Sequence, residues 1–423
     1  MTMLHDLVKD HDALYFSSGI AEPSALIDEL LAKVAPKRDD LRLFQVMTGS
    51  NGRLFEAVRH GHHLLTPAPG PLREEAARGE VEVLDLSMRQ CAAAIETRDL
   101  PFDGALVTAV RFGDEIALVP ATDLAAIAFE RARFRAVEVL PGWGHRPTGP
   151  TFSVADVDYF VEGTAIAALP ATGPPSAAAR RIGELVADLV PDGAVLELGV
   201  GGALAAVAEC LVELQRRVAI HSGLVSDWAR QLVEGGVATV PLECAGGRSL
   251  VAAVAMGSDG FNKWVAETNA VTFADSRHAH DPGHLMGLRP FVAINSAMAL
   301  DLHGQVGVFE DTSDSHPPGG LLDFAIGGAY GGLSIIAVTS QTRDGRSRIV
   351  PRLGRVQLTR SLVSHVVTEY GVAELRGRSL SECRTALLEV AHPDHRAALM
   401  EATAPPTIDK RRPPATATEP RES

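Results

Sequence analysis

The chain of 423 residues lacks several features that mark common classes of protein. Its only four cysteines are Cys91, Cys210, Cys244 and Cys383, which stand far apart and form no C-x-x-C pair. Neither a zinc site nor a disulfide framework is therefore predicted from them. The net charge is −14 and no long run of Lys and Arg occurs, which argues against a nucleic-acid surface.

The sequence also shows neither a membrane-spanning pattern nor the pattern of a secretory signal. No stretch reaches the roughly 18 apolar residues that a membrane-spanning helix needs. The first residues, MTMLHDLVKD, lack the basic start and apolar core of a secretory signal. We therefore expect a cytoplasmic protein with neither membrane nor nucleic-acid partners. Hydrophobic residues make up 46% and charged residues 22%, as in a globular protein with a large core.

Strand-like apolar runs alternate with helical patterns in both halves of the chain, separated by the proline-rich segment 169–178. In the first half, residues 104–112 and 115–123 are expected to form an antiparallel pair. The runs with strand character include 13–19, 41–49, 80–87, 134–142, 194–199, 217–223, 250–258, 270–275 and 333–341. This alternation predicts an α/β protein of two tandem doubly wound lobes with mostly parallel sheets.

The length favours two domains. We place an N-terminal lobe at residues 1–172 and a C-terminal lobe at 179–402. A Pro-, Thr- and charge-rich disordered tail follows at 403–423. Residues 290–309 are expected to form a hairpin, and the six glycines within 317–332 are expected to form a loop that can approach a ligand closely.

A carboxylate, Glu197, stands inside the apolar run AVLELG, just before a turn that contains Gly199 and Gly201. An unpaired ionised carboxylate is costly in an apolar interior, so Glu197 must be paired, protonated or placed at the edge of a cleft. Parallel sheets bind ligands at the carboxyl ends of their strands, which is where this turn is predicted to lie.

Two other interpretations of these segments are weaker. The turn after Glu197 resembles the nucleotide-binding turn of S-adenosylmethionine methyltransferases, but the next strand, RVAIHSG (217–223), lacks the acidic residue that such a site needs. His278, His280 and His284 have metal-like composition, yet their spacing lies in a Pro/Gly segment without helical register, so no metal ligands are predicted.

Three segments together are specific: FVAINSAMALDLHGQVG (291–307), GGLLDF (319–324) and HVVTEYGVAELRGRSLSE (365–382). They resemble the acetyl-CoA hydrolase/transferase family, which includes 4-hydroxybutyrate and butyryl-CoA:acetate CoA-transferases. The resemblance implies two lobes of the CoA-transferase fold with the active site between them, and a mechanism in which a glutamate carries the acyl group. It also implies acyl-CoA and a small carboxylate as partners, coenzyme A as substrate without a separate cofactor, and a homodimer.

The family pattern places the nucleophilic glutamate at position 223, where this chain has glycine. Glu197 is then the candidate acid/base, because desolvation raises the pKa of a carboxyl and suits it to activate water. His221 and Glu243 are further catalytic candidates. Gly319 and Gly320 are expected to hold the thioester oxyanion. The other expected substrate-binding residues are Gly199, Gly201, Gly223, Asn295 and Asp323.

Acyl-CoA transfer or thioester hydrolysis is the function predicted from these residues. Two alternatives stay open: Glu197 could have only a structural hydrogen-bonding role in a protein that binds CoA esters without catalysis, or the enzyme could be of the lyase or hydratase type, acting on a CoA-bound acyl chain.

Overall fold

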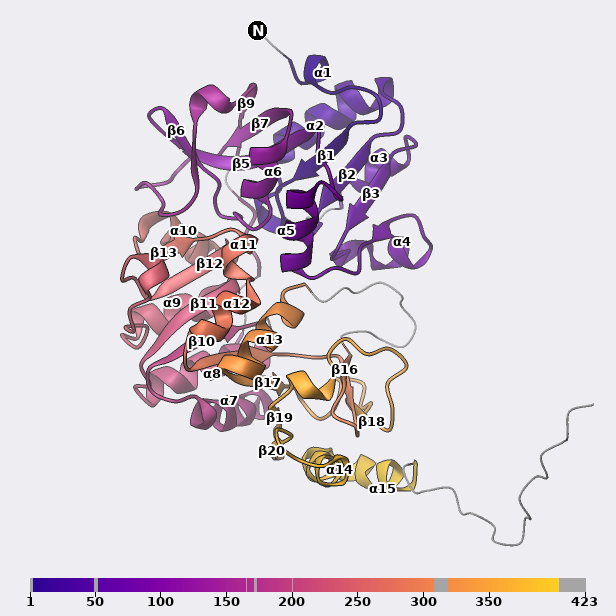
Figure 1. Cartoon of the computed structure of the whole chain (residues 1–423), viewed down its shortest axis with the longest axis vertical. Coiled ribbons are helices and arrows are strands. Elements are labelled where there is room, and N and C mark those ends of the chain that lie inside the picture. Colours follow the sequence, from indigo (N-terminus) through magenta and orange to yellow (C-terminus); the bar gives the residue numbers. More distant parts are fainter. Residues whose placement is uncertain are drawn as a thin grey trace, which may run out of the picture.

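Two separate β-sheets divide the chain into an upper and a lower lobe (Figure 1). The computed structural model describes residues 3–48, 52–164, 166–170, 173–199, 201–307 and 319–402. The predicted tail, 403–423, and a part of the predicted linker lie outside these residues. All strands of the first sheet precede residue 163, and those of the second sheet follow residue 193.

The first lobe has a sheet of nine strands, in the order β4-β3-β2-β1-β5 with β7 and β9 beyond β5, and β6 and β8 as an antiparallel extension. The predicted antiparallel pairing of β5 with β6 is confirmed. The strands are β1 (Ala13–Phe16), β2 (Arg42–Gln45), β3 (His63–Thr66), β4 (Glu82–Val83), β5 (Gly104–Phe112), β6 (Glu115–Ala117), β7 (Phe134–Val139), β8 (Thr151–Ser153) and β9 (Tyr159–Glu162).

Short helices lie on both faces of this sheet, and most of them bury apolar side chains against it. Helix α5 begins at a capping box, in which Ser87 accepts from the N–H of Gln90 and Gln90 accepts from the N–H of Ser87. The helices are α1 (Leu4–Leu7), α2 (Ser24–Glu29), α3 (Phe55–Val58), α4 (Arg73–Ala77), α5 (Met88–Thr97) and α6 (Ala125–Arg131).

The second lobe has a sheet of eight strands in the order β13-β12-β11-β10-β14-β17-β19-β20, parallel except for the last pair. Its central strands are continuous apolar runs, as expected for a sheet covered on both faces. The strands are β10 (Ala194–Leu198), β11 (Val218–Val225), β12 (Leu250–Ala255), β13 (Val271–Phe273), β14 (Phe291–Asn295), β17 (Gly332–Ala337), β19 (His365–Thr368) and β20 (Gly371–Glu374).

The helices of this lobe divide between the two faces of the sheet. Leu196 and Ile220 face the side covered by α7 to α10, whereas Val195 and Ala219 face the side of α12 and α13. Since side chains alternate along a strand, Glu197 and His221 share the face of α12 and α13. The helices are α7 (Ala177–Leu189), α8 (Gly202–Glu213), α9 (Asp227–Glu234), α10 (Asp259–Glu267), α11 (Ser276–Ala279), α12 (Pro282–Gly287), α13 (Leu321–Gly331), α14 (Leu380–Val390) and α15 (Pro393–Ala402).

The hairpin expected at 290–309 is wrong in its first part. Strand β14 joins the main sheet in parallel with β10 and β17. Only β15 (Ala299–Asp301) and β16 (Val306–Gly307) pair antiparallel, and they belong to a separate small sheet with β18 (Ile349–Val350). The apolar run 291–295 is long enough to form a central strand by itself, which leaves the hairpin to the following residues.

The loop expected at 317–332 is also wrong for most of its length, because residues 321–331 form helix α13. Its glycines serve close packing rather than flexibility. A Cβ added at Gly328 would lie 2.3 Å from the carbonyl oxygen of Leu333, and one added at Gly327 would lie 2.6 Å from Cβ of Leu285. Residues 317 and 318 of the same segment lie outside the described residues.

The carboxyl ends of the two sheets meet where the lobes contact each other. Ala121 of the first lobe pairs with Val254 in an isolated bridge, and Met256, which follows β12, adjoins Gly19, which follows β1. Ion pairs between Arg277 and Glu130, at 2.8 Å, add to this interface. The carboxyl ends of the strands in the second lobe, where candidate site residues are expected, therefore lie near the boundary between the two lobes.

Candidate active site

Glu197 lies near the carboxyl end of β10 and is buried, with 3% of its surface exposed. Its Oε2 accepts a hydrogen bond of 2.7 Å from Nδ2 of Asn295. Burial raises the pKa of Glu197 to about 8, although hydrogen bonds from Asn295 and the backbone of Ile294 oppose the rise. The carboxyl is therefore mostly protonated at neutral pH and can act as an acid or, once ionised, as a base.

Asn295 and Gly199 complete the immediate surroundings of this carboxyl. Glu197 pairs in register with Ala293 of β14, so the end of β14 carries Asn295 alongside the carboxyl. A Cβ at position 199 would lie only 2.8 Å from Oδ1 of Asn295. Glycine is thus required at this turn for the amide to approach, and the structure brings together three of the predicted site residues.

Gly223 and Gly320 converge on one side chain, His280. A Cβ at position 223 would lie 2.5 Å from Nε2 of His280 and 3.0 Å from the ring of Phe324. A Cβ at position 320 would lie 3.0 Å from the same Nε2 and 2.8 Å from the same ring. The imidazole is buried, and burial lowers its pKa to about 3. In the sequence, His280 lies in a segment that contains Pro and Gly, and no neighbouring residue indicates that it approaches both glycines.

Asp323 does not face open space. Its Oδ1 accepts from Oγ of Ser87 at 2.6 Å, and its Oδ2 accepts from the N–H of Arg89 at 3.0 Å. It thereby caps helix α5 of the first lobe from helix α13 of the second. Burial raises the pKa of this carboxyl to about 7, with both hydrogen bonds opposing the rise. Asp323, which was predicted to bind substrate, instead forms hydrogen bonds that join the two lobes.

The remaining predicted residues are spread around this centre. His221 of β11 is buried, and burial lowers its pKa to about 3. Glu243 is exposed on the short 3₁₀ turn Glu243–Ala245, and no described hydrogen bond joins it to Glu197. Gly201 caps the N-terminus of α8, with open space where a Cβ would be, a position that favours negative charge. Gly319 accepts from the N–H of Met88 through its carbonyl oxygen.

A buried polar group in the first lobe was not singled out from the sequence. The carboxylate of Asp123 accepts from Oγ of Ser18 at 2.7 Å and from the hydroxyl of Tyr15 at 3.3 Å. Burial raises the pKa of this carboxyl above its ordinary value. The carbonyl of Asp123 also accepts from the N–H of Ser276, so this group lies at the lobe boundary. In the sequence, the polar strand end Ser17-Ser18-Gly19 is the feature that could have indicated this group.

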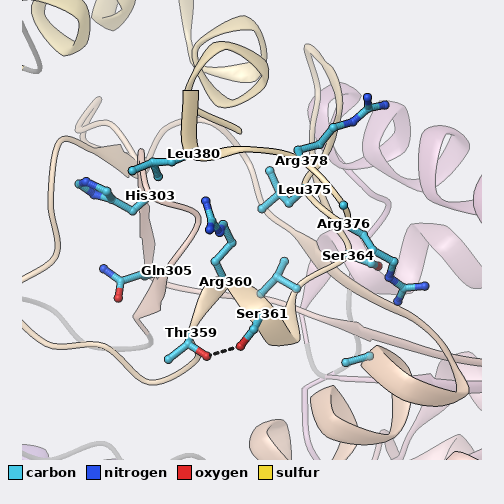
Figure 2. Close-up of a pocket in the computed structure, with 13 residues that line it drawn as sticks. His303, Gln305, Thr359, Arg360, Ser361, Ser364, Leu375, Arg376, Arg378 and Leu380 are labelled. Carbon is cyan, nitrogen blue, oxygen red and sulfur yellow. Dashed lines mark hydrogen bonds between the residues drawn. The ribbon is translucent and has the colours of Figure 1, made fainter. Parts of the chain in front are cut away.

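A cavity of about 580 Å³ lies elsewhere, in the C-terminal part of the second lobe. Figure 2 shows Arg360 extending into this space beside His303, while the guanidinium groups of Arg376 and Arg378 point away from its centre. Thr359 and Ser361 share a hydrogen bond of 2.8 Å at its rim. None of the predicted site residues lines this cavity, so it is distinct from the centre around Glu197.

No helix among the described residues is long and apolar enough to cross a membrane.

Known proteins resemble the chain over nearly its whole length. Residues 257–403 match the model of the acetyl-CoA hydrolase/transferase C-terminal domain. The 4-hydroxybutyrate coenzyme A transferase of Clostridium kluyveri is 29% identical over 413 residues, covering 93% of this chain and 94% of the relative. The succinyl-CoA:acetate/propanoyl-CoA:succinate CoA transferase of Fasciola hepatica is 28% identical over 412 residues, covering 93% and 85%.

Solved structures share the two-lobed architecture. RipA from Yersinia pestis aligns with a TM-score of 0.84 at 26% identity, covering 93% of this chain and 94% of that protein. The 4-hydroxybutyrate CoA-transferase from Porphyromonas gingivalis aligns with a TM-score of 0.75 at 24% identity, covering 94% of each chain, and shows the same fold. The chain is thus similar to the acetyl-CoA hydrolase/transferase family: residues 257–403 match its C-terminal domain, and CoA transferases resemble 93% of the chain at 28–29% identity.

Proposed function

We propose that the protein acts on the thioester of an acyl-CoA, either hydrolysing it or passing the CoA to a small carboxylate, with Glu197 as the acid/base. Curated relatives over most of this length are CoA transferases. The observation that carries the proposal is the buried Glu197 carboxyl at the carboxyl end of β10, beside Asn295 and with a pKa of about 8.

The chemistry follows from the two protonation states of this carboxyl. The ionised form takes a proton from water, and the oxygen of that water bonds to the thioester carbonyl carbon. The oxyanion is stabilised by backbone N–H groups of the Gly319-Gly320 turn. When the C–S bond breaks, the proton on Glu197 passes to the leaving thiolate, which restores the carboxylate and releases coenzyme A and the free acid.

The surroundings of Gly223 favour hydrolysis over the two-step transfer that passes through a glutamyl thioester. Position 223 has no side chain to attack the thioester, and Nε2 of His280 occupies the space that a side chain there would need. Transfer through Glu197 as the nucleophile is the second candidate, supported by the transferase activities of the relatives. In either case we propose that coenzyme A is substrate or product and that the protein forms a homodimer.

The test is thiol release from a panel of acyl-CoA esters, with and without acetate, by the wild type and by Glu197→Gln. We expect release without acetate that Glu197→Gln lowers by roughly 100-fold or more, within the usual range for general acid–base catalysis. Glu243→Gln is the matched control, because its carboxylate is exposed. Acetate-dependent release alone would instead assign a transferase.

Two results would overturn the assignment to Glu197. Full activity in Glu197→Gln would show that the carboxyl has only a structural role. A wild type that is inert on every ester, but binds them, would indicate a CoA-ester-binding protein. In that case the double variant Gly223→Glu/His280→Ala, which supplies a carboxylate and the space for it, tests whether the scaffold still supports acetate-dependent exchange.

A further inference from the structure

Three side chains distant in sequence meet on the face of the second sheet that α12 covers. His221 lies on β11, Cys244 on the 3₁₀ turn after the segment VPLE, and His284 on α12. One ligand atom from each, a ring nitrogen or the thiol sulfur, lies within 4.8 Å of the other two. The ring of His278 packs against that of His284 at a tilt of 39°, with 4.2 Å between centroids, on one side of the group.

The hydrogen bonding of His221 leaves one of its nitrogens without a partner. Nε2 lies 3.2 Å from the carbonyl oxygen of Ala279. Because a carbonyl oxygen can only accept, Nε2 must carry the proton, and Nδ1 of the neutral ring is then a bare acceptor. That Nδ1 is buried without a hydrogen-bond partner, in a residue with 0% of its surface exposed. A buried acceptor without a donor is costly, so the site is built for something that binds it.

His284 repeats this feature from the opposite side. Its Nε2 is also buried without a partner. The backbone at His284 is held because Asp281 caps α12, with Oδ1 accepting from the backbone N–H of His284 at 2.8 Å, and because Pro282 occupies the first helical position. Asp275 caps the preceding helix α11 in the same way, accepting from the N–H of Arg277. The loop that carries these histidines is therefore fixed by its own caps.

We propose that Nδ1 of His221, Sγ of Cys244 and Nε2 of His284 bind a divalent transition-metal ion of the zinc class. Imidazole and thiolate together select zinc and its neighbours, whereas Mg²⁺ and Ca²⁺ prefer oxygen ligands. In tetrahedral zinc sites with these bond lengths, ligand atoms lie roughly 3.3–3.7 Å apart. The ligand atoms lie within 4.8 Å of one another, so a contraction of at most about 1.5 Å reaches that geometry.

The bond from His221 to the carbonyl of Ala279 is the outer contact that metal-binding histidines usually make, because it fixes the tautomer and the ring orientation. Three protein ligands leave a fourth position for water, as in zinc sites that are not purely structural. This set differs from the one rejected on spacing alone: His280 faces Gly223 and Gly320, and Cys244 takes part instead. The proposal does not depend on the proposed function.

The test starts with protein dialysed against a chelator and titrated with Zn²⁺ by calorimetry, and with Co²⁺ by absorption spectroscopy. We expect one ion to bind per chain, and a sulfur-to-cobalt charge-transfer band that Cys244→Ser abolishes. Cys244→Ser and His284→Gln change partly exposed positions, so both variants are expected to fold. Each should weaken Zn²⁺ binding by at least about 10-fold.

Cys210→Ser is the matched control, because Cys210 lies on α8 on the other face of the sheet. It should leave Zn²⁺ binding unchanged. In the wild type, Zn²⁺ should also slow the alkylation of Cys244 by iodoacetamide, and this protection should be lost in His284→Gln. Absence of binding, or binding that Cys210→Ser weakens as much as Cys244→Ser does, would overturn the proposal.

Discussion

Replacing Glu197 by Gln should change how the stability of the protein depends on pH. Burial raises the pKa of this carboxyl from 4.5 to about 8 in the folded protein. In the unfolded chain it ionises near its ordinary value, so between these two pH values the folded state keeps a proton that the unfolded state has lost. The stabilising effect of that proton is complete below about pH 4.5 and is lost as the pH rises through about 8.

The magnitude follows from the width of this window. Each pH unit within it lowers the free energy of unfolding by about 1.4 kcal/mol, which gives an upper limit of roughly 5 kcal/mol over the whole window. Gln is neutral at every pH and keeps an oxygen that can accept from Asn295. The free energy of unfolding of Glu197→Gln, relative to the wild type, should therefore rise by about 3 kcal/mol between about pH 5.5 and 8.

Urea unfolding of both proteins at several pH values measures this difference. Taking the difference removes the contributions of other groups, including Asp323, that titrate in both proteins. Glu243→Gln is the control, since its carboxylate is exposed and its curve should run parallel to that of the wild type. A difference between Glu197→Gln and the wild type that stays constant with pH would refute the reasoning.

Three further predictions concern the lobe boundary and the site. Gly223→Ala should lower the free energy of unfolding by about 1–3 kcal/mol through overpacking, because its Cβ would lie 2.5 Å from Nε2 of His280. In thermal unfolding, the loss should be suppressed when His280→Ala is also present. If the effects of the two substitutions on stability simply add, the proposed contact is contradicted. Ser87→Ala should cost about 1–3 kcal/mol by leaving Asp323 with a broken hydrogen bond, and should speed limited proteolysis between the lobes; unchanged proteolysis would argue against the clamp. Asn295→Ala removes a hydrogen bond that lowers the pKa of Glu197, so the pH profile of thiol release should move to higher pH. An unchanged profile would show that Asn295 does not influence the group whose titration controls activity.

The sequence predicted most of the main strands because apolar runs in a parallel sheet are visible locally. The error at helix α13 had a different cause. Glycine is a poor helix former, and six glycines in a short segment predicted a loop. In the folded protein a Cβ at Gly328 would clash with the backbone of β17, and one at Gly331 would lie only 3.1 Å from the backbone of α12, so these glycines allow the helix to approach both. Tertiary packing outweighed local propensity.

The site was predictable only in part for a similar reason. Glu197 was conspicuous because a carboxylate inside an apolar strand is costly, and the structure places it at a strand end as a buried group. Its partner Asn295 is 98 residues away in sequence, and the approach of His280 to Gly223 depends on the packing of α11 and α13. The grouping of His221 with Cys244 has the same origin. Spacing along a chain carries no information about such contacts.

Helix α13 has a consequence for movement within the molecule. Its glycines seat it flush on its own sheet, while Asp323 on the same helix holds the first turn of α5 in the other lobe. Helix α13 therefore links the two lobes: it packs closely on the sheet of the second lobe and is hydrogen-bonded to helix α5 of the first. A substrate that needed the lobes to part would first have to extract a buried carboxyl from its two donors. Any parting of the lobes at this contact is therefore opposed by the loss of these two hydrogen bonds.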